Sequence, residues 1–144
     1  MLKKITICSI LMLAAIAATS AQSARTPEKG SPERKAILDA LRVPIEKELG
    51  QKIIFVADEF KLQGTWAFVS GTPQTADGGK PDYRKTEYRD AVDSGAFDNN
   101  FFALLRKTRG KWRVVTKAIG CTDVCYADWW QTHKAPKAIF PYTE

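Results

Sequence analysis

The sequence is poor in the side chains that most catalytic and metal sites use. Its 144 residues contain one histidine, His133, and three cysteines. No Ser/His/Asp or Cys/His arrangement has a suitable local context, so the pattern does not favour nucleophilic catalysis. Internal repeats and coiled-coil heptads are absent as well. We therefore expect a protein that is not an enzyme and that needs no cofactor.

Long hydrophobic runs are also lacking, except at the start. Lys3 and Lys4 precede an apolar run over 5–18, and small residues follow it as far as Ala24. This order is typical of a secretory signal peptide, and the run is too short for a membrane span of ~20 residues. We predict a signal peptide over 1–24, a periplasmic or secreted protein after its cleavage, and no stable membrane insertion.

The chain after this segment has no strong excess of positive charge. The formal net charge of +6 falls to +4 without 1–24, because Lys3 and Lys4 leave and no acidic residue does. Nucleic-acid-binding domains are more strongly basic than this, so nucleic acid is not an expected partner. We predict a flexible lead-in over 25–31 and a single globular domain over 32–144.

A helix opens the predicted domain. Ser31 is suited to cap a helix and Pro32 to occupy its first position. Apolar residues then recur at helical spacing until Gly50, a residue that commonly ends helices. The pattern predicts a helix over 32–49 with a kink at Pro44.

Strands account for most of the remaining chain. Turn residues at 108–110 join the last two strands into a hairpin, and a short helix is expected near 88–93 within a long connection. In the last strand the residues alternate, so one face of the sheet should be core and the other at least partly wet. The four predicted strands are 52–62, 65–72, 101–107 and 111–119.

The C-terminal segment is rich in aromatic residues. Tyr126, Trp129 and Trp130 are too apolar to leave exposed, so we expect this segment to fold back as a short helix or turn and to close one end of the sheet. The adjacent Trp129 and Trp130 cannot face the same way, and at least one could line an interface. The predicted fold class is α+β, with an N-terminal helix packed on a curved four-stranded antiparallel sheet and a short C-terminal aromatic segment.

Several stretches resemble a family of small exported bacterial proteins without an assigned activity. The resemblance covers nearly the whole predicted mature chain. A helix followed by strands is also similar to the NTF2-like and cystatin-like folds, in which a curved antiparallel sheet wraps a helix. Neither resemblance implies catalytic residues. The stretches that carry the first are 34–56, 64–74, 101–115, 122–130 and 134–141.

Cys121 and Cys125 are the only cysteines left after the predicted cleavage. An oxidising compartment favours a disulfide between them, and a turn can bring residues at this spacing to bonding distance. A metal site is an alternative, because two sulfurs and the imidazole of His133 would suit Cu(I) or Zn. Tyr126 follows the second cysteine where copper-handling proteins commonly have proline. Thiol exchange is a further alternative.

The predicted second hairpin carries the most marked charge pattern. No acidic residue occurs between Asn99 and Thr122, whereas six basic residues do, Lys117 being the last of them. Such a surface suits anionic glycans, lipid head groups or an acidic protein. Alternatively, the charges only discourage strand-to-strand association. The predicted binding residues are Arg106, Lys107, Arg109, Lys111, Arg113, Trp129 and Trp130.

Together these features indicate an exported, non-catalytic binding or interaction protein of the bacterial envelope or extracellular space. Its expected partner is an anionic envelope component or another exported protein. Two alternatives stay open. One is a small-ligand pocket protein of NTF2-like type with weak acid/base chemistry, and the other is an inhibitor or immunity-type partner of an exported hydrolase.

Overall fold

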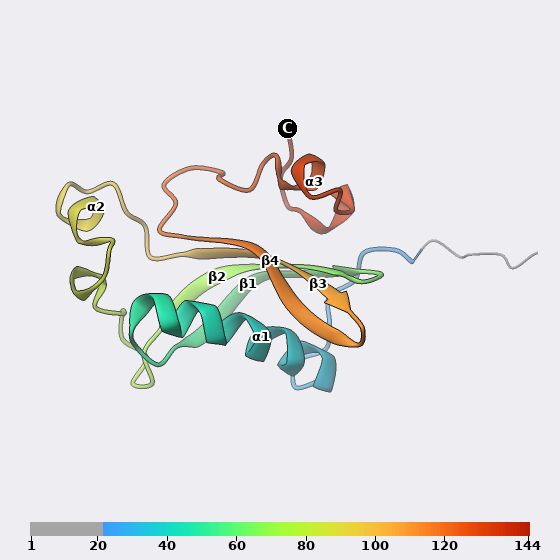
Figure 1. Ribbon diagram of the computed structural model, residues 1–144, viewed down its shortest axis with the longest axis horizontal. Coiled ribbons are helices and arrows are strands. Elements are labelled where there is room, and N and C mark those ends of the chain that lie inside the picture. Colours follow the sequence, from blue (N-terminus) through green and yellow to red (C-terminus); the bar gives the residue numbers. More distant parts are fainter. Residues whose placement is uncertain (1–21) are drawn as a thin grey trace, which may run out of the picture.

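A computed structural model describes residues 22–144, so residues 1–21 of the predicted signal peptide lie outside the described residues. One helix is followed by four strands in a single antiparallel sheet of order β1-β2-β3-β4 (Figure 1). This arrangement confirms the predicted α+β class. The elements are α1 (Pro32–Leu49), β1 (Ile54–Gln63), β2 (Trp66–Gln74), the 3-10 helix η1 (Tyr83–Lys85), α2 (Arg89–Asp93), β3 (Phe101–Thr108), β4 (Lys111–Ile119), α3 (Trp129–Thr132) and the 3-10 helix η2 (Lys137–Ile139).

The ends of α1 are fixed by the residues that the sequence suggests. The Ser31 hydroxyl accepts a hydrogen bond from the backbone N–H of Arg34 at 3.2 Å, which satisfies one of the free donors of the first turn. Gly50 ends the helix with a left-handed φ of 64°, a conformation that glycine adopts without a steric penalty. The helix continues through Pro44.

One face of α1 packs on one face of the sheet. Its buried side chains recur every four residues and meet residues from all four strands in one apolar cluster. Burial of this stripe holds the helix in place, since a short helix has little stability of its own. The fully buried members include Ile37, Leu41, Ile45, Ala67, Val69, Ala103 and Leu105.

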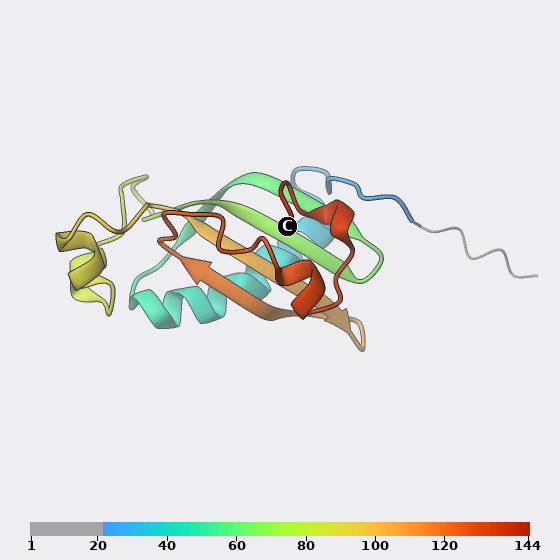
Figure 2. The ribbon, with the colours of Figure 1, turned by 90° about the horizontal axis from the view of Figure 1, so that it is seen from above.

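The opposite face of the sheet is covered in part. The rest is wet, as predicted, since Ile54 and Val56 on this face are 48% and 42% exposed. The chain after β4 runs back across this face, so that α3 and α1 lie on opposite sides of the sheet (Figures 1 and 2). Phe68 and Leu104 are fully buried here against Tyr126, Trp129 and other C-terminal residues. The aromatic segment therefore covers part of a face of the sheet and does not merely close one end.

The predicted flexible lead-in is wrong for part of its length. Arg25 forms an antiparallel bridge with Leu62 through two backbone hydrogen bonds of 2.8 Å, and Pro27 is fully buried. Polar composition suggested a loose segment, but the free edge of β1 offers backbone groups that such a segment can pair with.

A bulge bends β1 near its middle. The pairing with β2 shifts between Ala57 and Glu59, which leaves Asp58 as the extra residue. The backbones come so close here that a Cβ on Gly71 would lie 2.0 Å from the carbonyl oxygen of Val56. Glycine at this position therefore permits the bulge. No helix within 22–144 is long and apolar enough to cross a membrane.

Candidate functional site

The β3–β4 hairpin ends in a tight turn with an unusual residue at its tip. Arg109 and Gly110 are the two turn residues, with φ values of 52° and 76°. Positive φ at both positions is required by the two-residue turn that fits strand twist, and Asn-Gly is the sequence that favours it. Arginine rarely adopts this backbone conformation. Its presence puts a positive charge at the outermost point of the hairpin.

Five basic side chains gather around this turn, and all of them are exposed. None forms an ion pair with an acidic residue within the part of the chain that the structure describes. We name this surface the basic hairpin and define it by its members, which are the first five predicted binding residues: Arg106, Lys107, Arg109, Lys111 and Arg113.

Two tryptophans, one on each face of the sheet, contact cations of the basic hairpin. The guanidinium of Arg106 lies 4.9 Å from the ring centre of Trp66, and the ammonium of Lys107 lies 5.9 Å from that of Trp112. Cation–π contacts of this length hold a cation over an aromatic face while leaving its outer side free. The sequence analysis did not predict Trp66 as part of this surface. Trp66 lies on β2, and only the register between β2 and β3 pairs it with Arg106.

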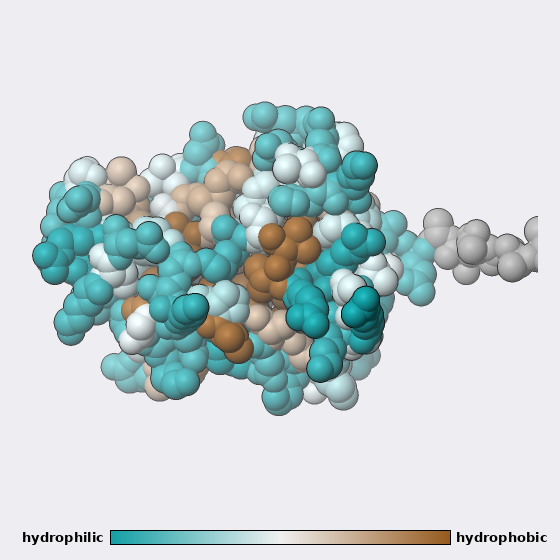
Figure 3. All heavy atoms as spheres, viewed as in Figure 1, coloured by the Kyte–Doolittle hydropathy of each residue, from teal (hydrophilic) through white to brown (hydrophobic). Residues whose placement is uncertain are grey.

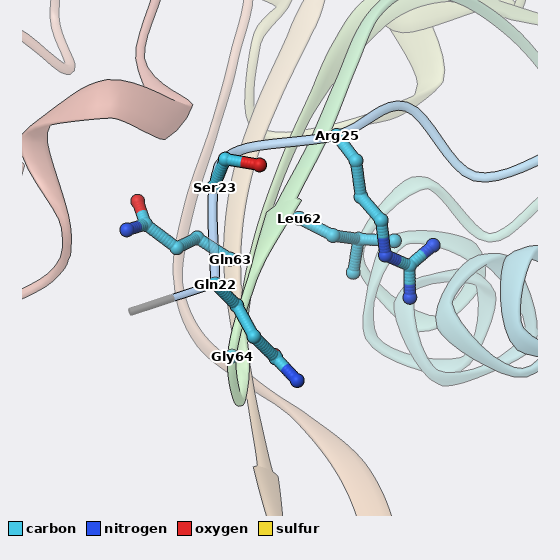
Figure 4. A pocket seen from close by; sticks show the side chains of 6 residues that line it. All are labelled: Gln22, Ser23, Arg25, Leu62, Gln63 and Gly64. Carbon is cyan, nitrogen blue, oxygen red and sulfur yellow. The ribbon is translucent and has the colours of Figure 1, made fainter. Parts of the chain in front are cut away.

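The tip of the neighbouring β1–β2 hairpin lies beside the basic hairpin. The N–H of Lys107 donates to the carbonyl of Thr65 at 2.7 Å. A hollow of about 280 Å³ lies next to this tip, between it and the N-terminal segment, with Arg25 and Gln63 on its wall (Figure 4). The side-chain oxygen of Gln63 is buried and has no hydrogen-bond partner among the described residues.

The sixth cation of the acid-free stretch does not belong to this surface. Lys117 lies on the helix face of the sheet, where its ammonium pairs with the carboxylate of Glu48. Both side chains are about one-fifth exposed, at 20% and 19%. Burial lowers the pKa of Lys117. Its charge is therefore compensated inside the fold.

The two cysteines form the predicted disulfide, with their Cα atoms 6.3 Å apart. Both sulfurs are thereby bonded to each other, so neither is a thiolate that could bind a metal. Within 22–144 no group of three His, Cys, Asp or Glu side chains is placed to hold a metal ion. His133, the third ligand of the alternative metal site, is the C-cap residue of α3.

The two adjacent tryptophans have different environments. Trp129 is 8% exposed and belongs to the apolar cluster beneath the C-terminal segment, so we correct its assignment as a binding residue. Trp130 is half-buried. Its indole N–H donates to the backbone carbonyl of Glu144 at 2.9 Å, and the ammonium of Lys137 lies 4.6 Å from its ring centre. Both indole rings therefore contact other residues of the same chain.

The most exposed apolar side chains lie on separate elements of the fold. In the view of Figure 3 most surface residues are hydrophilic, and the hydrophobic ones gather near the centre of the face. The most exposed large apolar side chains described are Val43, Tyr142 and Ile54, which lie on α1, the C-terminal tail and β1. Broad apolar patches are the usual sign of a stable protein interface. Charge is therefore the more distinctive feature of this surface.

Comparison with protein-family models, with curated proteins and with solved structures finds no match to this chain.

Proposed function

We propose that the chain is an exported, non-catalytic binding protein whose basic hairpin binds an anionic envelope component or an acidic exported protein. The observation that carries this proposal is Arg109 at the turn, in a left-handed conformation. That conformation costs an arginine about 1 kcal/mol. A hairpin that only had to turn would favour Asn or Gly here.

The charge of the basic hairpin supports the same function. Its five cations have no acidic partner in the described residues, and several cations close together repel one another. Solubility alone would be served by mixed charges spread over the surface. Cations held over Trp66 and Trp112 lose less freedom on binding than free lysine and arginine side chains do.

A binding assay with defined anionic probes tests this function. The probes are heparin, and vesicles of phosphatidylglycerol with phosphatidylcholine vesicles as the neutral reference. We expect the protein to bind at least one anionic probe, and binding should weaken as salt shortens the Debye length from ~10 Å at 0.1 M to ~3 Å at 1 M. Lys107→Glu with Lys111→Glu should reduce binding about tenfold or more, with thermal stability almost unchanged because both side chains are exposed.

The matched control changes the same net charge elsewhere. Lys29→Glu with Lys47→Glu alters two exposed lysines outside the basic hairpin, so it should keep most of the binding. Equal loss in the two double variants would mean that net charge alone attracts the probe, and the proposed site would be wrong. Binding to neither anionic probe would contradict the function itself.

Export is the other part of the proposal. The charged start, apolar run and small residues over 1–24 support a signal peptide, and a disulfide is compatible with an oxidising compartment. Intact-mass analysis of the protein from its native host should show the loss of about the first 21–24 residues. An uncleaved species confined to the cytoplasm would contradict export and remove the reason for choosing envelope partners.

A further inference from the structure

Both ends of the outer edge of β1 are occupied by other parts of the chain. At one end, the N–H of Ile53 donates to the carboxylate of Glu46 at 3.0 Å, and its carbonyl accepts from Arg42 at 3.3 Å. At the other end, the N–H and carbonyl of Leu62 pair with Arg25. Two separate segments thus use this edge, and each uses one residue of it.

The middle of the same edge is free. In a strand, alternate residues direct their backbone groups to the same side, so Phe55 and Ala57 point outward like Ile53. Their outward N–H and carbonyl groups have no hydrogen-bond partner within residues 22–144. The N-terminal segment does not reach them, because Pro27 comes two residues after Arg25 and has no N–H to donate.

A slot with an apolar floor runs along this free edge, with two arginines on its α1 side and the acidic Asp58 and Glu59 at the bulge of β1. Arg34, Leu38 and Arg42 follow at four-residue spacing on α1, so they share one helix face. The guanidinium of Arg34 lies 4.5 Å from the ring centre of Phe60, and that of Arg42 lies 5.8 Å from Phe55. Leu38 packs against the apolar core between the two arginines.

Space for a ligand exists beside this edge. A hollow of about 340 Å³ borders residues 57–61 and Arg34. A second hollow of about 420 Å³ borders Arg34, Leu38 and Arg42 along the helix. Because Arg34 lines both hollows, an extended chain of a few residues could occupy them together.

We infer that this slot binds an extended acidic peptide segment, which adds as a strand to Phe55 and Ala57 and places a carboxylate on Arg34. The N-terminal segment already shows that an extended backbone can pair with this edge, at Leu62. Arg34 has one side-chain hydrogen bond, to the carbonyl of Pro27 at 3.4 Å, and no acidic partner among the described residues. Asp39, by contrast, pairs with both Arg42 and Lys35.

The chemistry of the slot specifies this ligand. Backbone pairing gives affinity for any extended chain, and side-chain contacts give specificity. A guanidinium that lies over an aromatic ring and has no acidic partner favours a carboxylate, since its fork of donors matches the two oxygens. An apolar side chain next to that carboxylate would contact Leu38. This site lies on the α1–β1 side of the molecule and does not depend on the basic hairpin.

Selection from a random linear-peptide display library tests this inference. The full protein is the bait, and the Arg34→Glu variant is the counter-selection. Enriched peptides should contain an acidic residue flanked by apolar or β-branched ones. A selected peptide should slow hydrogen exchange at the amides of Phe55 and Ala57. Arg34→Glu should weaken binding of this peptide about tenfold or more. Lys47→Glu, on the same helix, and the Lys107→Glu/Lys111→Glu variant should bind it as the wild type does.

Several outcomes would overturn the inference. They are the absence of any enriched peptide, equal binding by Arg34→Glu, and protection of amides other than those of Phe55 and Ala57. Concentration-dependent protection of these two amides without peptide would assign the edge to a second copy of the chain instead. If Arg34→Glu does not fold, Arg34→Gln removes the cation with less disturbance, and the exchange measurement on the wild type needs no variant.

Discussion

Lys117 on β4 donates a hydrogen bond to Glu48 on α1, and the two residues are 69 positions apart in the chain. The same carboxylate accepts a hydrogen bond from the hydroxyl of Tyr88, which immediately precedes α2. Glu48 thus joins the helix, the edge strand and the long β2–β3 connection at one point. Both charges are largely removed from water, so their pairing matters for stability.

Breaking this pair should destabilise the fold. Lys117→Met leaves Glu48 half-buried without its cation, and we expect the free energy of unfolding to fall by about 1–3 kcal/mol. Lys117→Met with Glu48→Leu removes both charges and should recover part of the loss. Urea unfolding of the single and double variants gives the coupling energy.

The exposed pair between Lys52 and Glu46 provides the control. Lys52 is 89% exposed, so Lys52→Met should change stability by less than about 0.5 kcal/mol. A loss as large as that of Lys117→Met would mean that burial does not distinguish the two pairs.

Local sequence patterns predicted the helix well, because its limits are set by nearby residues. Ser31 and Gly50 cap α1 by contacts within four positions of themselves. The pair between Lys117 and Glu48 could not be predicted in this way, since it depends on how α1 lies against β4. From the sequence alone Lys117 was one more cation of the acid-free stretch.

Alkaline pH should destabilise the protein through Tyr83. This side chain is 2% exposed, and burial raises its pKa to about 12. In the unfolded chain the phenol ionises near pH ~10. Above that pH the unfolded state loses its proton first, so the stabilisation present below pH ~10 is lost as the pH rises through the folded pKa, by at most about 2–3 kcal/mol.

Unfolding in urea as a function of pH checks this expectation. Tyr83→Phe should flatten the loss of stability between pH ~10 and ~12 relative to the wild type. It also removes the hydrogen bond to Asn99, which lowers stability equally at all pH values below this range. Tyr142→Phe changes an exposed ring and should keep the wild-type slope. An unchanged slope in Tyr83→Phe would exclude Tyr83 as the titrating group.

The adjacent tryptophans should differ strongly in their effect on stability. Trp129→Ala opens a cavity in the cluster beneath the C-terminal segment and should cost about 3–5 kcal/mol. Trp130→Ala removes a half-buried ring with one hydrogen bond and should cost about 1–2 kcal/mol. Thermal unfolding of both variants separates them. Similar losses would mean that the C-terminal segment packs through both rings equally.

The candidate site was only partly predictable for a related reason. The basic residues of the hairpin all lie within 106–113, so both their charge and the turn between them are evident from the sequence. Which tryptophans contact these basic residues is not evident from the sequence. Trp66 belongs to another hairpin, and the register of β2 against β3 brings it to Arg106. Trp129 was predicted as a binding residue, whereas the way the C-terminal segment lies over Phe68 and Leu104 buries it.

The turn residue Arg109 should show opposite effects on stability and on binding. Asparagine tolerates a left-handed backbone far better than arginine does, so Arg109→Asn should raise the free energy of unfolding by about 0.5–1 kcal/mol. The same change removes the outermost cation of the basic hairpin and should weaken binding to the anionic probes. Urea unfolding and heparin affinity, measured on one preparation, give both quantities.

Lys111→Asn is the matched control, because it removes a neighbouring cation from a strand position. It should weaken binding without any gain in stability, since asparagine is disfavoured in strands. Arg109→Asn with improved stability and undiminished binding would show that the charge at the tip has no part in recognition. In that case the left-handed arginine would have no functional explanation, and the proposed role of the basic hairpin would lose its main support.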